Sequence, residues 1–518
     1  MNSNNFLLPA TILGIIGCNQ PIKKPERPNI ILIMGDDIGY SDIGCYGSEI
    51  NTPNLDYLAQ NGLRFRTFYN AAKSEPSRSL LLTGLYQGDD RSLNIASVLR
   101  QNGYYTMHAG KEHFFKWVPE SCYAVNAFDT SFYYWAINQY LIPPDSMFKN
   151  PFYLHGKKLS IDKMLTGPNS FYKTDVETNY ALAFLEEARK RNKPFFLYLA
   201  YNAAHFPLQA MPEDIAKYRG KYKEGWDVIR QRRYERMRAM GLLTEKYKLS
   251  PPSSNINKYR GHPKGDEEIR AKIPLYRPWI SLTEKEKDEL DLEMAVYAAM
   301  IDRMDQNIGR IIQWLKKNNL FENTVIMYLS DNGACPYDSN RDFDHPPGGA
   351  DSYRSLCAAW ANMGNTPFKY FKQFGHEGGC HTHFIVHWPA QIAGGTFTDE
   401  PGHITDIFPT LLDIADCKYP ETTGTLPTIP LHGKSLLPVF KGGIRDTLNE
   451  FMSGHTENFR MFRSGDWKIV RSNGEKWELY HLAEDPSEIN NLAEKMPEKV
   501  VEIEQKYLQF INARGIHQ

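Results

Sequence analysis

Residues 29 to 37 read Asn-Ile-Ile-Leu-Ile-Met-Gly-Asp-Asp, and this segment sets the architecture of the chain. A nearly continuous apolar run is typical of a strand that is buried on both faces of a parallel sheet. The run leads through a glycine into two adjacent carboxylates, Asp36 and Asp37. Open α/β sheets bind ligands at the C-terminal ends of their strands. The segment therefore predicts an α/β fold with a functional site at this strand end.

Two further apolar runs, 194–201 and 324–329, also predict buried strands, and segments with helical spacing lie at 175–191 and 283–318. The run at 324–329 ends in Ser-Asp-Asn-Gly, which contains Asp331 and Asn332. An isolated Asp-Asn-Gly is usually a turn. Two acidic strand ends favour a metal site instead, and their carboxylate and amide oxygens favour Ca²⁺ or Mg²⁺ over zinc.

A third motif lies in residues 70–86, Asn-Ala-Ala-Lys-Ser-Glu-Pro-Ser-Arg-Ser-Leu-Leu-Leu-Thr-Gly-Leu-Tyr. We expect a helix with Pro76 at its first position and Gly84 at its end. Ser74 would then lie just ahead of the helix, at its positive end, with Arg78 about one turn away. This arrangement suits an anion-handling nucleophile, although such short motifs also occur in ordinary helix-start turns.

The 70–84 segment resembles the signature of the type I sulfatases, members of the alkaline phosphatase superfamily, in which a Cys or Ser is oxidised to formylglycine. Several other motifs of that family follow in order between residue 28 and the C-terminus. The resemblance assigns Ser74 as the serine to be converted. It also implies a calcium site with the ligands Asp36, Asp37, Ser74, Asp331 and Asn332.

The same resemblance implies roles for five other side chains. Lys111 in Gly-Lys-Glu-His, His205 in Ala-Ala-His-Phe-Pro and Lys372, five residues before Glu-Gly-Gly, correspond to groups that contact the sulfate. Arg78 and His113 correspond to groups that position and activate residue 74. The chain departs from the family at Glu112, where the family usually has Trp, and after Tyr86, where Gln-Gly replaces the common Pro-His.

The chemistry implied is hydrolysis of a sulfated carbohydrate or aryl sulfate. One hydroxyl of the hydrated aldehyde attacks sulfur, and deprotonation of the other expels sulfate; His205 or Lys372 could assist the leaving oxygen. The bound Ca²⁺, with Mg²⁺ as the less favoured ion, would act as Lewis acid and template. A serine at position 74 implies maturation by a radical-SAM enzyme before export.

For the fold, the resemblance implies a large α/β/α sandwich with a mixed, mostly parallel sheet of the alkaline-phosphatase type. We place this catalytic domain at 28–430. Short alternating segments at 460–463, 467–471 and 477–480, followed by an amphipathic segment at 494–513, predict a small α+β subdomain with an antiparallel sheet at 431–518.

The N-terminal residues 1–27 resemble an export signal and linker. An apolar stretch at 6–16 is long enough for a signal-peptide core and too short to span a bilayer. It leads into Ile-Ile-Gly-Cys, which resembles a bacterial lipobox ending at Cys18. We expect a periplasmic protein or an outer-membrane lipoprotein, attached to the membrane only through Cys18. The alternative is a buried N-terminal helix or strand.

Composition limits the remaining possibilities. The 518 residues carry a net charge of −1, which argues against a general nucleic-acid binder. The seven cysteines form no CxxC pair and are interpreted mainly as buried small apolar residues. Residues 217–248 mix Lys, Arg and Glu, which favours a solvated helix over a polyanion-binding patch.

Two other functions stay open from the sequence. The first is a phosphomonoesterase or phosphodiesterase of the same superfamily that uses the serine directly, although donors for a second, zinc-type metal are not evident. The second is a surface lipoprotein that binds sulfated glycan without cleaving it. The sequence leaves open the sugar, the sulfated position, endo or exo action and the oligomeric state.

Overall fold

The computed structural model describes residue 1 and residues 27–135, 139–142, 151–166, 171–253, 278–336, 345–445, 450–456, 459–472 and 475–516. The apolar stretch at 6–16 and Cys18 lie outside these residues. Within the part of the chain described, no helix combines the length and apolar character needed to cross a membrane.

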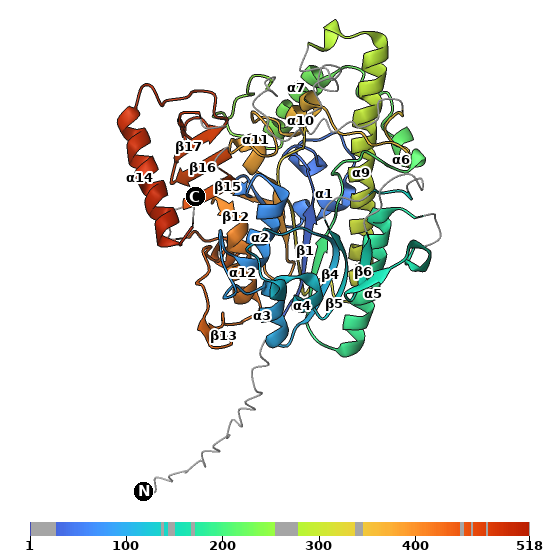
Figure 1. Ribbon diagram of the computed structural model, residues 1–518, viewed down its shortest axis with the longest axis vertical. Helices are drawn as coiled ribbons and strands as arrows, with labels where there is room; N and C mark the ends of the chain where they lie inside the picture. The colour runs from blue at the N-terminus through green and yellow to red at the C-terminus, as the bar shows by residue number, and fades with distance from the viewer. Residues whose placement is uncertain are drawn as a thin grey trace.

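A ten-stranded sheet forms the centre of the molecule (Figure 1). Strand β1 (Asn29–Gly35) lies between β8 (Phe195–Ala200) and β9 (Thr324–Ser330) and pairs with both in parallel. All residues of these three strands are buried. The sequence-based prediction of buried parallel strands is confirmed, because such strands are covered on both faces.

The remaining strands extend the sheet on both sides in the order β11-β2-β10-β9-β1-β8-β4-β5-β6-β7. On one side the strands β4 and β5 continue the parallel arrangement, while β6 and β7 are antiparallel. On the other side β10 is antiparallel to β9. Their bounds are β2 Leu63–Phe65, β4 Tyr105–Glu112, β5 Thr130–Trp135, β6 Phe152–Leu154, β7 Lys157–Leu159, β10 Phe384–His387 and β11 Thr396–Thr398.

Helices cover both faces of the sheet, and alternate residues of β1 show this division. Ile31 and Ile33 belong to one apolar core, which includes the packed faces of α5 and α9. Ile30 and Leu32 belong to the other, which includes α2, α3 and α12. The bounds are α1 Pro53–Gln60, α2 Ser74–Thr83, α3 Ile95–Gln101, α5 Lys173–Arg191, α9 Glu284–Lys317 and α12 Ile407–Ile414. The predicted α/β/α sandwich is confirmed.

Four antiparallel strands and helix α14 (Pro497–Ala513) follow in the chain and lie at one side of the sandwich (Figure 1). The sheet order is β15-β16-β17-β18. Its strands are β15 Glu450–Thr456, β16 Phe459–Ser464, β17 Trp467–Ser472 and β18 Glu478–His481. The expected antiparallel subdomain is present with one strand more than predicted, β15. The boundary at residue 430 stays a prediction.

Residues 65–69 do not form one strand. They are divided between β2 and the short strand β3 (Phe68–Tyr69), which pairs with β12 (Gly402–His403) outside the main sheet. Within 217–248, helix α7 (Trp226–Ala239) is not wholly solvated. Its Arg233 is fully buried and pairs with Asp42 at 2.5 Å.

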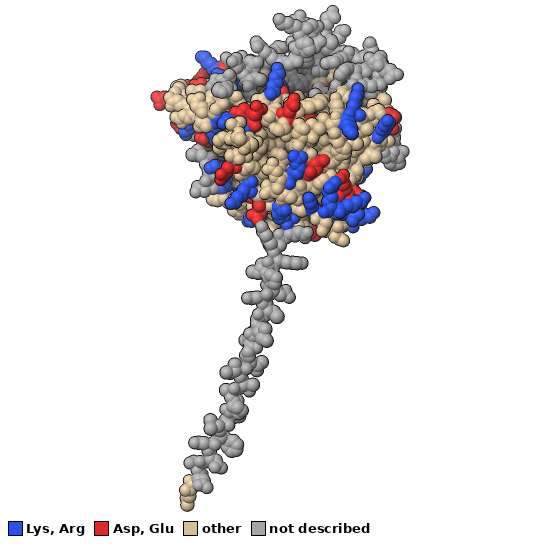
Figure 2. Space-filling model, turned by 60° about the horizontal axis from the view of Figure 1, so that its bottom comes forward, with Lys and Arg blue, Asp and Glu red and all other residues tan. Residues whose placement is uncertain are grey.

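The described cysteines agree with their interpretation as buried apolar residues. Six are described, none of them in a disulfide, and all but the half-buried Cys417 are buried. On the face shown in Figure 2, acidic and basic side chains are interspersed.

Candidate active site

Helix α2 presents the hydroxyl of Ser74 at the carboxyl ends of the parallel strands. Ser74 is the first helical residue rather than the residue ahead of the helix, so Pro76 is the third; Gly84 ends the helix with φ +69°, as expected. The side chain is buried and shares its proton between Asp331 Oδ2 and Asp36 Oδ1, the latter 3.1 Å away. Its oxygen lies 3.2 Å from Lys111 Nζ.

The guanidinium of Arg78, one turn along α2, holds two of these carboxylates together. Its Nε and Nη2 lie 3.0 and 2.9 Å from Asp331 Oδ2, and Nη2 lies 3.5 Å from Asp36 Oδ2. Burial opposes the positive charge, but Asp331 and Asp36 keep the pKa of Arg78 above its ordinary value. Arg78 is therefore a permanent cation next to the two carboxylates that accept hydrogen bonds from Ser74.

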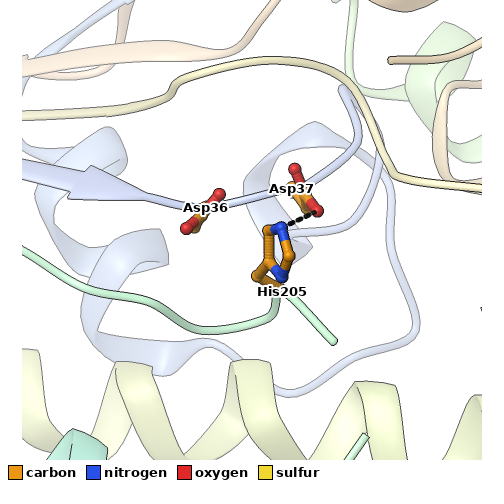
Figure 3. A group of neighbouring side chains, drawn as sticks. All are labelled: Asp36, Asp37 and His205. Atoms are coloured by element: carbon orange, nitrogen blue, oxygen red, sulfur yellow. Dashed lines mark ion pairs between the residues drawn. The ribbon is translucent and has the colours of Figure 1, made fainter. Parts of the chain in front are cut away.

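Asp37 is the centre of a second group. Lys372 Nζ donates to its Oδ1 at 2.6 Å, and Asn332 Nδ2 donates to the same oxygen at 2.7 Å. His205 Nε2 faces its Oδ2 at 3.5 Å (Figure 3). Lys369, three residues before Lys372, instead contacts Tyr480 and Glu478 at 2.6 and 3.4 Å. The structure thus places Lys372 in the site and Lys369 outside it.

His113 follows β4 directly and lies in the electrostatic field of this group, although no hydrogen bond joins it to Ser74. Burial first, then Lys111 and Arg78, lower its pKa to about 2, so the imidazole is neutral. Its Nδ1 is buried without a hydrogen-bond partner among the described residues. The other predicted site residues are joined directly through the contacts of Asp36, Asp37 and Asp331.

The carboxylates carry unequal charge. Burial alone would raise the pKa of Asp36, but Lys111 at 2.5 Å, His205 and Arg78 hold it well below its usual range. Burial and the neighbouring Asp36 raise the pKa of Asp331 to about 6. Near pH 6 the Asp331 carboxyl is therefore about half protonated, because burial and the charge of Asp36 outweigh the nearby cations at this group.

The donor set fits a hard divalent cation. Asp37 Oδ2 and Asn332 Oδ1 are buried without a hydrogen-bond partner in the part of the chain that the structure describes. His205 Nδ1 lies 2.8 Å from the Phe206 carbonyl, so in the neutral ring Nε2 is an acceptor facing Asp37. Asp36, Asp37 and His205 bring ligand atoms within 4.8 Å of one another. Such clustered acceptors call for a cation.

Two contacts explain how helix α2 and the segment after β9 are brought together at the site. Ser77 Oγ accepts from Ala71 N at 2.9 Å and donates to the Asp331 carbonyl at 2.6 Å, which fastens α2 to the end of β9. A Cβ on Gly333 would lie 2.0 Å from the Gly378 carbonyl. Glycine is thus required at 333 by a close approach between two segments distant in sequence.

A buried ion triad that sequence reasoning missed supports the segment after Lys372. Lys468 of β17 contacts Glu377 at 2.6 Å and Glu488 at 2.8 Å, and Glu488 also accepts from the Glu377 backbone N–H at 2.8 Å. In the sequence, Glu377 served only as part of the Glu-Gly-Gly motif that locates Lys372. A single lysine and a single glutamate in the C-terminal region carry no sequence signal.

A buried hydroxyl at a helix start, set among acidic and basic groups at the carboxyl edge of an α/β/α sandwich, is an arrangement suited to the hydrolysis of anionic esters. The family model described as "Sulfatase" matches residues 28–417, and the model described as "N-sulphoglucosamine sulphohydrolase, C-terminal" matches residues 367–512. This chain belongs to the sulfatase family and is a sulfuric ester hydrolase.

Similar proteins span nearly the whole chain. An uncharacterized sulfatase of Schizosaccharomyces pombe is 30% identical, with 95% of each chain covered. An arylsulfatase of Klebsiella aerogenes is 29% identical over 84% of this chain and 96% of its own. An N-acetylglucosamine-6-O-sulfatase of Bacteroides thetaiotaomicron is 26% identical, over 95% of this chain and 87% of its own.

The fold is shared with solved structures. That of Ps i-CgsB in complex with k-i-k-neocarrahexaose matches with a TM-score of 0.66 at 24% identity, covering 94% of this chain and 93% of the other. This likeness agrees with the predicted architecture of the alkaline phosphatase superfamily.

Proposed function

We propose that this chain is a formylglycine-dependent, calcium-binding sulfatase that removes sulfate from a sulfated carbohydrate or an aryl sulfate. The observation that carries the proposal is the position of Ser74 Oγ, which lies 3.1 Å from Asp36 and 3.2 Å from Lys111 in a buried site. The relatives named as an arylsulfatase and an N-acetylglucosamine-6-O-sulfatase support the two substrate classes.

The cation would be held by Asp36, Asp37, Asp331 and Asn332 together with residue 74. When bound, it supplies Lewis-acid stabilisation of negative charge on the sulfate oxygens. The orphaned oxygens of Asp37 and Asn332 support this assignment. Hard oxygen donors favour Ca²⁺ over softer metals, with Mg²⁺ as the alternative.

Conversion of Ser74 to formylglycine would supply a hydrated aldehyde, which can release sulfate after the attack instead of retaining a stable serine ester. The protein groups would do the rest. Arg78 and the neutral imidazole of His113 would position residue 74. Lys111, Lys372 and the form of His205 that is protonated at Nε2 would bind the sulfate oxygens, and either His205 in that form or Lys372 could protonate the leaving oxygen.

We further propose that the chain is exported to the periplasm or anchored in the outer membrane of a bacterium through Cys18, and that a radical-SAM maturing enzyme converts Ser74 before export. Support for both comes only from the sequence motifs. Labelling with a fatty-acid analogue, compared between the native chain and Cys18→Ala, tests the anchor.

The central experiment is mass spectrometry of the peptide containing Ser74, purified from the native host, together with sulfate release. Formylglycine would appear as a loss of two hydrogens at Ser74. We expect the converted protein to hydrolyse 4-nitrophenyl sulfate and defined sulfated saccharides, and to hydrolyse 4-nitrophenyl phosphate far more slowly. An unconverted serine with no sulfate release favours glycan binding alone, and a preference for phosphate favours the phosphoesterase.

A further inference from the structure

Three aromatic side chains form a continuous group at the carboxyl ends of β4 and β5. Phe114, next to His113, stacks on Tyr123 with centroids 5.6 Å apart and planes 8° apart. Tyr123 meets Trp135 at 5.2 Å, nearly perpendicular. Trp135 is 38% exposed, so one of its ring faces is available to a ligand. We call Phe114, Tyr123 and Trp135 the aromatic platform.

The platform adjoins the reactive centre. In the parallel pair β4 and β5, Lys111 lies opposite Tyr134 and Glu112 lies opposite Trp135. Lys111 Nζ is 3.2 Å from Ser74 Oγ, and His113, two residues further on, lies in the electrostatic field of Lys111, Arg78 and Asp36. Phe114 follows His113 directly, which brings this end of the platform next to the site. The backbone N–H of Phe115 donates to Ser79 Oγ at 3.0 Å, which holds this segment against α2.

Neighbouring side chains of β4, β5 and β6 hold the platform in place. Glu112 is buried, and its Oε1 accepts from the backbone N–H of Ala124 at 2.6 Å, which ties the residue after Tyr123 to the end of β4. Tyr133 contacts Trp135 at 6.3 Å, nearly perpendicular, and stacks on Tyr153 at 5.2 Å. Aromatic rings fixed in this way bind a ligand at little cost in conformational entropy.

We propose that the aromatic platform binds the sugar residue that neighbours the sulfated one, so that the preferred substrate is a sulfated oligosaccharide. This inference rests on the proposed function and names its substrate class. One face of a pyranose ring is lined with C–H groups, which pack on an aromatic ring while the hydroxyls stay hydrated. An exposed aromatic group that continues an active site is typical of a ligand-contacting surface.

The test compares Trp135→Ala with the wild-type holoenzyme on three probes: 4-nitrophenyl sulfate, a sulfated monosaccharide, and the oligosaccharide that ends in it. Heparan sulfate, chondroitin sulfate and carrageenan fragments supply the saccharides. We expect the ratio of kcat/KM for oligosaccharide to that for 4-nitrophenyl sulfate to fall roughly three- to tenfold, mainly through KM, which corresponds to one aromatic contact. Trp135→Phe should restore part of the ratio.

The matched control is Tyr57→Ala. Tyr57 is 37% exposed but packs against Phe321 and His387, and Phe321 precedes the amino end of β9, away from the site. It should leave the ratio unchanged. Equal losses on all probes in Trp135→Ala, or no loss on the oligosaccharide, overturn the platform. Wild-type protein that hydrolyses 4-nitrophenyl sulfate but no oligosaccharide also overturns it and leaves the sulfatase assignment intact, whereas inactivity on every probe removes the proposed function itself.

Discussion

Replacing Lys468 by Met should destabilise the protein because it leaves two buried acids without their shared cation. Lys468 is fully buried and lies 2.6 Å from Glu377 and 2.8 Å from Glu488. Removing one partner of a buried ion pair costs about 3–5 kcal/mol, since the remaining charge is neither hydrated nor paired. Two carboxylates are left here, which places the expected loss at the upper end of that range. Lys499→Met, which breaks a pair that is partly exposed, should cost at most about 1 kcal/mol.

The pH dependence has a definite sign. Burial alone would raise the pKa of Glu377, but Lys468 and His381 hold it well below its usual range. Its contribution to stability is therefore present above the unfolded pKa of about 4.3 and is lost as the pH falls through the lower folded value. Without Lys468, the buried carboxylate of Glu377 should be protonated in milder acid than in the wild type. The difference between variant and wild type should thus be largest near pH 7 and narrow toward acid.

Urea unfolding followed by tryptophan fluorescence measures the effect, with each variant compared at the same pH. The double variant Lys468→Met/Glu377→Gln removes one of the two stranded charges and should recover part of the loss, since the glutamine can still hydrogen-bond to Tyr69 and His381. The reasoning is wrong if Lys468→Met unfolds at the wild-type urea concentration, or if the double variant is less stable than the single one.

Three other predictions concern the site. Ser74→Ala should lower sulfate release at least about a thousandfold, measured as kcat with 4-nitrophenyl sulfate, because no attacking group remains. Lys372→Ala should lower kcat/KM about a hundredfold, whereas Lys369→Ala, outside the site, should change it less than threefold; equal effects would contradict the assignment. Ca²⁺ at about one hundred times its Kd should stabilise the protein by about 2.7 kcal/mol in thermal unfolding, and Asp37→Asn should abolish this gain while also destabilising the calcium-free protein, because it leaves the buried Lys372 without its carboxylate.

The central sheet could be predicted closely because β1, β8 and β9 are buried on both faces and therefore read as continuous apolar runs. Strand β15 could not, since its sequence Glu-Phe-Met-Ser-Gly-His-Thr has neither a sustained alternation nor an apolar run. The start of α2 was misplaced by two residues for a different reason. The first four backbone N–H groups of a helix have no intrahelical partner, so Pro76 is tolerated at the third position as well as the first.

The site residues at strand ends could be predicted for two reasons. Parallel strands end at the same edge of the sheet, and these residues match motifs of the sulfatase family. The hydrogen bonds and ion pairs that hold these residues together could not be predicted. Ser77 fastens Asp331 through its backbone carbonyl, a contact that depends on the docking of α2. The link from Lys468 to Glu377 joins residues 91 positions apart in sequence. Such contacts follow from tertiary packing, which single-residue patterns do not encode.

The charges in the site give a reason for the cation that is independent of the motifs. Asp36, Asp37 and Asp331 are matched by Arg78, Lys111 and Lys372, and all six are buried. Both lysines are occupied by carboxylates, at 2.5 Å for Lys111 with Asp36 and 2.6 Å for Lys372 with Asp37, so they are poorly placed to attract an anion. We infer that Asp36 and Asp37 would hold a divalent cation, which would supply the neutralising charge, and that Lys111 and Lys372 would then be available to bind sulfate. Inorganic sulfate should then inhibit and bind only when Ca²⁺ is present, as measured by calorimetry; equally tight binding to the chelated protein would refute this inference.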